Sequence, residues 1–275
     1  MTSSAFELVI KPRRGWQPVD FREIWNYREL LGFLIWRDIK IRYKQTMLGG
    51  LWAVLQPLIA MFIFGGLVNR VAKFPSDGSP YMLFVYAGLV PWTFFSNAVS
   101  LASGSLVANS SMLSKIYFPR ILLPLGAIGA LGLDMTISLA VMGVLMGYYR
   151  WHVSAGLLLL PIFMVGCFLA ASGLGMILAT MNVRYRDVKY VVPFFMQMMF
   201  FVTPVLYPLS LVPEWLRPLL ALNPMAGMIE GFRYALLGSP VPVGLMLSSF
   251  LGAAAVFVIS LYFLRRMERT FADVI

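Results

Sequence analysis

The sequence is short of charged residues, and this shortage excludes most soluble folds. Asp, Glu, Lys and Arg make up 12% of the 275 residues, against about 25% in ordinary soluble domains. Hydrophobic residues make up 60%, which is more apolar side chain than one aqueous core can bury. We therefore expect a polytopic membrane protein.

Side chains for catalysis and metal binding are also scarce. The sequence has one histidine, His152, which is too few for a multi-histidine metal site and offers little for a histidine-based catalytic dyad, so neither kind of site is expected. The single cysteine, Cys167, excludes an intramolecular disulfide. No glycine is followed by lysine, which excludes a phosphate-binding loop, and the acidic clusters that a membrane glycosyltransferase would need are missing. We expect no enzyme activity and no bound metal or cofactor, so ATP and Mg²⁺ would belong to a partner ATPase subunit.

A basic segment runs directly into an uncharged one at RDIKIRYKQTMLGGLWAVLQP, residues 37–57. At 100° per residue, Arg37, Lys40 and Lys44 share one narrow sector, and apolar residues occupy the opposite side. This pattern is typical of an interfacial helix on an anionic membrane surface, and a core helix with a solvated face is the alternative. The residues assigned to the interfacial helix are Arg37, Lys40, Arg42, Tyr43 and Lys44.

Six apolar runs are long enough to propose as membrane spans. They are 49–68, 81–107, 121–149, 153–181, 191–206 and 243–264. The proline-rich stretch 207–242 contains two short apolar pieces, 214–222 and 225–237, that fit re-entrant helices. The expected fold is all-α, with an N-terminal segment, 1–48, that carries the amphipathic interfacial helix, and a membrane domain, 49–275, with six transmembrane helices and two re-entrant helices before the last span.

The cations predict the orientation of these spans. The net charge of +10 would suggest nucleic acid in a soluble protein, but here the cations lie in short segments beside apolar runs, so no nucleic-acid partner is expected. With the N-terminus inside, 17 of the 22 Lys and Arg residues lie on the cytoplasmic side. The positive-inside rule therefore predicts that both termini are cytoplasmic. No signal peptide is expected, because 1–20 lacks an apolar stretch with a cleavage site.

Two further features carry hypotheses about function. The loop NSSMLSKIYFPR, 109–120, predicts a short cytoplasmic helix whose apolar side chains would be unusual in water without a partner, and an ordinary turn is the alternative. Asp134 is the only acid well inside a span. It is either a functional group or a structural acid that is protonated or hydrogen-bonded to a neighbouring helix.

Five segments in order resemble one family, the membrane subunit of bacterial ATP-binding cassette exporters for polysaccharides such as O-antigen, capsule and teichoic acid. The resemblance covers nearly the whole chain, and the first thirty or so residues match least. The segments are RDIKIRYKQTMLGGLWAVLQP (37–57), SKIYFPRILLP (114–124), NVRYRDVKYVVP (182–193), TPVLYP (203–208) and NPMAGMIEGFRYALLG (223–238).

This resemblance implies a homodimer in the bacterial inner membrane, surrounded by membrane lipids, with two copies of a cytoplasmic ATPase subunit and a lipid-linked glycan as substrate. The coupling helix that docks the ATPase would correspond to Ser111, Met112, Leu113, Lys115, Ile116, Tyr117 and Phe118. The re-entrant pieces would lie near the periplasmic exit, with Trp215, Glu230 and Arg233 at a gate. The alternative for Glu230 and Arg233 is a wet surface pair.

The glycan path is predicted from side-chain amides in apolar spans. Phe194, Gln197 and Phe201 share one face of the fifth span, and Trp52 and Gln56 share one face of the first. An amide facing hydrocarbon would be left unpaired, so these faces should meet protein or water. We expect all five residues to line the channel. The alternative is that the glutamines bond to each other across a helix interface and the rings only pack.

Two other transporter classes are considered. A type-2 efflux permease for drugs or lipids would share the six spans and the re-entrant element, but such permeases usually lack the basic entry helix. A secondary transporter would need several intramembrane charges and inverted repeats, and neither is evident.

Overall fold

The computed structural model describes residues 21–44, 51–68, 76, 78–240 and 243–268, and every regular element in them is a helix. The N-terminal segment before residue 21 and the outer cations Arg70 and Lys73 lie outside the described residues. The α-helices are α1 Phe21–Asn26, α2 Arg28–Lys44, α3 Leu51–Phe62, α5 Tyr81–Ala108, α6 Ser110–Leu113, α7 Leu122–Tyr148, α8 Leu160–Arg184, α9 Val188–Val202, α10 Arg217–Ala221, α11 Pro224–Leu237 and α12 Val243–Met267. The π-helix η1 Ile63–Val68 continues α3, and the 3₁₀ turns are η2 Ala155–Leu159, η3 Leu209–Leu211 and η4 Glu214–Leu216.

Each of the six predicted spans coincides with a helix, which confirms the all-α class. Within the described residues, four helical runs are long and apolar enough to cross a bilayer alone: Tyr81–Ala108, Leu122–Tyr148, Ala155–Arg184 and Val243–Met267. The helices at the other two predicted spans are shorter: one is α3 continued by η1, and the other is α9. Pro57 interrupts the hydrogen-bond ladder of α3, and α9 ends at Val202 before the Thr203–Pro204 step. Six complete spans therefore stay a prediction.

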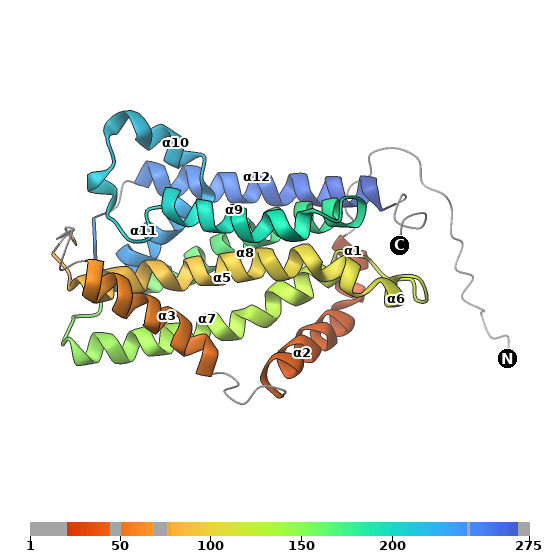
Figure 1. Cartoon of the computed structure of the whole chain (residues 1–275), viewed down its shortest axis with the longest axis horizontal. Coiled ribbons are helices and arrows are strands. Elements are labelled where there is room, and N and C mark those ends of the chain that lie inside the picture. Colours follow the sequence, from red (N-terminus) through yellow and green to blue (C-terminus); the bar gives the residue numbers. More distant parts are fainter. Residues whose placement is uncertain (1–20, 45–50, 69–75, 77, 241–242, 269–275) are drawn as a thin grey trace.

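The four long helices run side by side along the long axis of the molecule, with α5 between α7 and α8 (Figure 1). Close approach requires small residues at the contacts. A Cβ atom at Gly175 of α8 would lie 2.7 Å from the Cβ of Ala102 on α5, so only glycine fits there. Other helices cover most sides of α5, so most of its residues are buried. Its few part-exposed residues therefore mark the sides that no other described helix of the chain covers.

The predicted second re-entrant piece is the buried helix α11, which packs against α5, α8 and α12. Asn223 caps its N-terminus, where the side-chain oxygen accepts a hydrogen bond of 3.0 Å from the backbone N–H of Met225. Pro224 occupies the first turn, and Gly238 ends the helix at φ +74°, which favours glycine. The first piece forms only η4 and α10, so its re-entrant character stays a prediction.

The helix α2 packs against the first half of α7 through two glycines. A Cβ atom at Gly126 would lie 3.1 Å from the Cβ of Leu34, and one at Gly129 would lie 2.8 Å from the Cδ1 of Ile35. The predicted apolar face of α2 therefore rests on α7 rather than on lipid alone. The opposite face of α2 exposes Phe33 and Trp36 together with Lys40 and Lys44. This face is therefore both aromatic and basic, a combination that suits the membrane–water interface.

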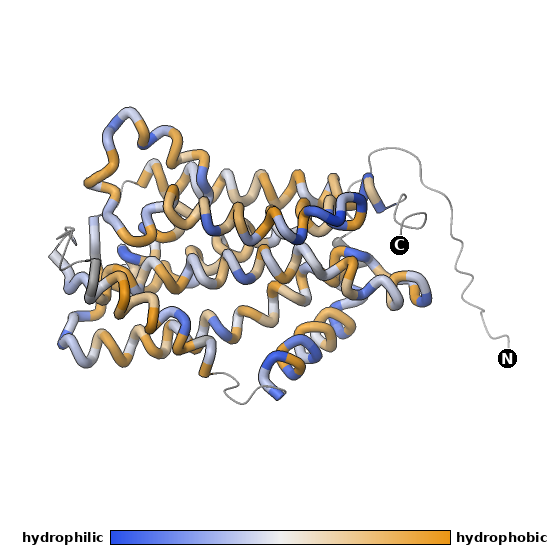
Figure 2. The backbone as a smooth tube through the Cα atoms, in the orientation of Figure 1, coloured by the Kyte–Doolittle hydropathy of each residue, from blue (hydrophilic) through white to orange (hydrophobic). Residues whose placement is uncertain are grey.

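The cations of the predicted inner loops gather at one end of the bundle. Figure 2 shows hydrophilic residues in the turn between α8 and α9 and at the end of α12, on the same side as α6. The 28 residues of α5 separate this end from Ser76, a rise of about 42 Å.

This separation makes the orientation testable by cysteine labelling. We expect Ser76→Cys to react with an impermeant thiol reagent from outside the cell, and Ser114→Cys to react only after permeabilisation. The parent protein serves as the control, because its Cys167 is fully buried and should stay unlabelled. The reverse pattern would overturn the assigned topology.

Candidate functional site

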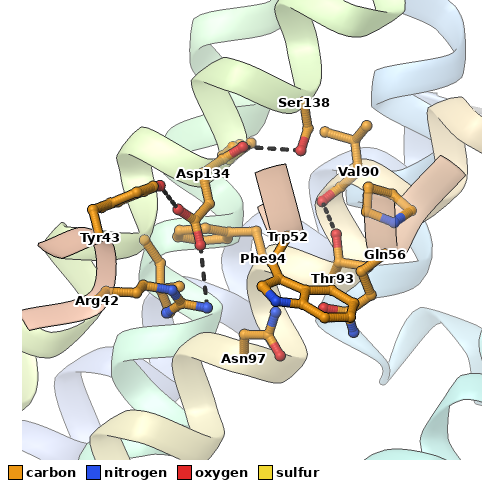
Figure 3. Close-up of a pocket in the computed structure, with 13 residues that line it drawn as sticks. Arg42, Tyr43, Trp52, Gln56, Val90, Thr93, Phe94, Asn97, Asp134 and Ser138 are labelled. Carbon is orange, nitrogen blue, oxygen red and sulfur yellow. Dashed lines mark hydrogen bonds and ion pairs between the residues drawn. The ribbon is translucent and has the colours of Figure 1, made fainter. Parts of the chain in front are cut away.

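A cavity of about 250 Å³ lies between α2, α3, α5 and α7 (Figure 3). We call it the Asp134 cavity. Polar residues from all four helices line it together with the ring of Trp52. Its lining consists of Arg42, Tyr43, Trp52, Gln56, Pro57, Val90, Thr93, Phe94, Asn97, Leu131, Asp134, Met135 and Ser138.

Asp134 is held by two consecutive residues of α2. The Tyr43 hydroxyl donates a hydrogen bond to Oδ1 of Asp134, and the Arg42 guanidinium forms an ion pair of 3.2 Å with Oδ2 (Figure 3). Burial and then the bond to Asp134 raise the pKa of the Tyr43 phenol, so it remains a donor. The hypothesis of a structural acid bonded to a neighbouring helix therefore matches the geometry, and the acid also lies in the wall of a cavity.

A second, more open cavity of about 430 Å³ lies between η1, α5 and α9. We call it the α9 cavity. Aromatic rings from three elements line it together with the side chain of Gln197. Its lining consists of Phe64, Trp92, Ser96, Ser100, Pro193, Met196, Gln197, Phe200 and Phe201.

Both cavities share a row of polar residues on α5 that was not predicted from the sequence. Thr93, Ser96, Asn97 and Ser100 recur at spacings of three and four, so they lie on one face of the helix, and each is part-exposed. We call this row the α5 polar stripe. The spacing was visible in PWTFFSNAVSLASGS, but small hydroxyl residues are common in membrane helices and did not stand out.

Four of the five predicted channel residues divide between these cavities. Trp52 and Gln56 line the Asp134 cavity, Gln197 and Phe201 line the α9 cavity, and Phe194 lines neither, although its ring is exposed. Within the described chain, Gln56 and Gln197 do not hydrogen-bond to each other, so the alternative of paired glutamines is not seen in a single chain. The cavities offer hydrogen bonds and ring faces. No three His, Cys, Asp or Glu side chains of the described residues come together as a metal site.

The predicted coupling segment is less helical and less exposed than expected. The helix α6 ends at Leu113, and just after it the Ser114 hydroxyl donates a hydrogen bond to the carbonyl of Ser111. Phe118 is buried, which corrects its assignment as an exposed docking residue. Its ring packs in a core cluster with Ile121 and Leu122. Ser111 and Lys115 are exposed, Met112 and Leu113 are half-buried, and the exposed large apolar side chains are Ile116 and Tyr117.

Two contacts tie the residues on either side of the coupling segment, 111–118, to other helices. Arg37 of α2 donates a hydrogen bond of 3.0 Å to the side-chain oxygen of Asn109, which precedes α6. Arg120 donates a hydrogen bond of 2.7 Å to the carbonyl of Glu268 at the end of α12. Among the other residues assigned to the interfacial helix, Lys40 and Lys44 are exposed. The helix α2 therefore lines the Asp134 cavity and also contacts Asn109, beside the coupling segment.

The assigned gate residues separate into a buried pair and an exposed ring. Arg233 and Glu230 form an ion pair of 2.7 Å with side chains 0% and 6% exposed, so the alternative of a wet surface pair is wrong. Arg233 also donates a hydrogen bond of 2.6 Å to the carbonyl of Val205, and its guanidinium lies 3.6 Å from the ring centre of Phe84. Trp215 is 74% exposed and lies apart from this pair in the surface turn η4.

Arg233 therefore clamps the chain that follows α9 onto α5 and α11. Glu230→Ala should leave the guanidinium buried without its carboxylate and should destabilise the protein by about 3–5 kcal/mol. A lower melting temperature in nanodiscs would show this loss. Glu214→Ala is the matched control, because its ion pair with Arg217 is long, at 3.9 Å, and exposed. If the pair also holds a gate closed, Glu230→Ala should raise dye leakage from liposomes, and leakage equal to wild type would contradict the gate.

Comparison with known proteins places the chain in a family. A profile of the family "ABC-2 type transporter" matches residues 29–237. The O-antigen export system permease protein RfbA of Myxococcus xanthus is 35% identical over 77% of this chain and 82% of the relative. An RfbA of Klebsiella pneumoniae is 27% identical over 90% and 95%, and the polysialic acid transport protein KpsM of Escherichia coli is 23% identical over 78% and 84%. The chain therefore belongs to the ABC-2 type transporter family.

Proposed function

We propose that this chain is the permease subunit of an ABC exporter that moves a lipid-linked polysaccharide out of the cytoplasm across the inner membrane. Relatives named for O-antigen export and polysialic acid transport support this class of substrate. The observation that carries the proposal is the α5 polar stripe with a ring-lined cavity on each side. In an apolar bundle, a row of part-exposed hydroxyls and amides marks a path for a polar solute.

A complete transporter requires partners that this chain recruits. We propose two copies of the chain, because Gln56 and Gln197 are both exposed on a single chain and an amide is costly against lipid. Two cytoplasmic ATPase subunits would bind ATP and Mg²⁺ and contact the coupling segment. In this arrangement, both termini and α6 lie on the cytoplasmic side, as the cation distribution supports.

The ATPase contact is testable at Ile116, which is 59% exposed. Ile116→Asp should abolish co-purification of the ATPase subunit or uncouple ATP hydrolysis from transport, because a charge buried unpaired in an interface costs a few kcal/mol. Ile116→Met keeps an apolar contact and should retain the partner. Retention of a fully coupled ATPase by the aspartate variant would exclude Ile116 from the interface.

The glycan path is testable at the rings of the two cavities. Phe201→Ala and Trp52→Ala should each lower glycan export several-fold, because they remove a ring face from the path while the subunit still assembles. Export is measured as glycan on the cell surface, and assembly as co-purification of the ATPase.

Phe195→Ala is the matched control, because Phe195 neighbours the predicted channel face of α9 but lines neither cavity. We expect near-normal export from this variant. Normal export by Phe201→Ala and Trp52→Ala, or loss of assembly in both, would show that these rings pack the helices together and do not line the glycan path.

A further inference from the structure

We propose that the Asp134 cavity is a binding site for one neutral sugar residue of the exported glycan, with the indole of Trp52 against the ring and the Gln56 and Asn97 amides and the Asp134 carboxylate bonded to its hydroxyls. This inference rests on the proposed function and names a site within it. The four residues come from α3, α5 and α7 and converge on the same space (Figure 3).

Charge decides what class of ligand the cavity accepts. Its lining contains one cation, Arg42, and one anion, Asp134, and these pair with each other at 3.2 Å. The formal charge of the wall is therefore zero, which favours neither a phosphate nor a metal ion. The polar lining equally disfavours an acyl chain, because the amides would be left unpaired. A neutral ligand with several hydroxyl groups fits these constraints.

Unused hydrogen-bonding groups point into this space. Gln56 and Asn97 make no side-chain hydrogen bond to any described residue, and each amide can donate two bonds and accept two. The Asp134 carboxylate has about four acceptor positions, and its contacts in the described chain are with Tyr43 and Arg42. Amides and a carboxylate together can donate to and accept from neighbouring hydroxyls, as a sugar requires.

The ring and the volume set the size of the ligand. Trp52 is 54% exposed, so its indole offers an open apolar face to the C–H side of a pyranose. The cavity of about 250 Å³ corresponds to roughly eight water volumes, which is the scale of one sugar residue rather than a chain. Thr93 and Asn97 belong to the α5 polar stripe, so a residue bound here remains next to the proposed path.

The test uses the full chain with its ATPase subunit in nanodiscs free of sugar-based detergent. The probes are methyl glycosides of mannose, galactose, rhamnose and N-acetylglucosamine, followed by saturation-transfer NMR. We expect at least one glycoside to receive saturation at its ring C–H protons. Asn97→Leu keeps the volume of the side chain and removes the amide, so it should weaken binding about tenfold. Trp52→Ala should abolish it.

Trp36→Ala is the matched control, because Trp36 is a similarly exposed indole on α2 that does not line the cavity. It should bind the glycoside like wild type. No saturation transfer from the wild-type protein to any of the glycosides, or equal binding of the glycoside by wild type and Asn97→Leu, would overturn the site. Since Asn97 has no partner to lose within the described chain, its variant decides the question even if Trp52→Ala fails to assemble.

Failure of the site and failure of the proposed function give different results. If cells with wild-type protein export glycan but no glycoside binds, the function stands and the site is wrong. If the wild-type protein exports no glycan although its ATPase is bound and active, the function itself is wrong, and glycoside binding then reports a neutral sugar site with another use.

Discussion

The carboxylate of Asp134 fixes the position of α2, and the rest of the site depends on that position. An ionised acid among apolar helices is costly unless it is paired and hydrogen-bonded. Arg42 and Tyr43 supply both interactions from adjacent positions on α2. The two glycines of α7 at 126 and 129 let α2 approach closely enough for this contact. Loss of the acid would therefore remove two contacts of α2 with α7, while the packing of Leu34 and Ile35 against α7 would remain.

The helix α2 also joins two regions that the sequence suggested separately. One end forms a wall of the Asp134 cavity through Arg42 and Tyr43, and Arg37 reaches Asn109 beside the coupling segment. Arg42 lies five positions after Arg37, about 7.5 Å along the helix axis. A continuous helix of this length does not bend easily, so a shift of α2 at the cavity also displaces its contact with Asn109. One helix thus joins the cavity to the segment proposed to contact the ATPase subunit.

Local sequence patterns predicted the helices well because apolar runs and prolines act over short distances. The run from 81 to 107 and the helix α5 differ by one residue at the end, and Asn223, Pro224 and Gly238 set the ends of α11. Residue chemistry alone could not predict which distant groups would meet. Phe118 reads as an exposed ring but is buried, and Glu230, whose spacing from Arg233 also fits a surface pair, is buried in an ion pair with Arg233. Such contacts depend on tertiary packing, which a single helical period does not encode.

The α5 polar stripe supports the proposed dimer, because a single chain leaves this row of polar residues part-exposed. Thr93, Ser96, Asn97 and Ser100 face outward between α3 and α9 and are only part-covered. Helices in a bilayer gain little from burying apolar surface against each other, so polar groups and small residues drive their association. A second copy that places its own stripe opposite would enclose a polar space between two apolar bundles. The rings of Trp52 and Phe201 would then border that space. A ring face can contact each sugar in turn, whatever the sequence of sugars in the glycan.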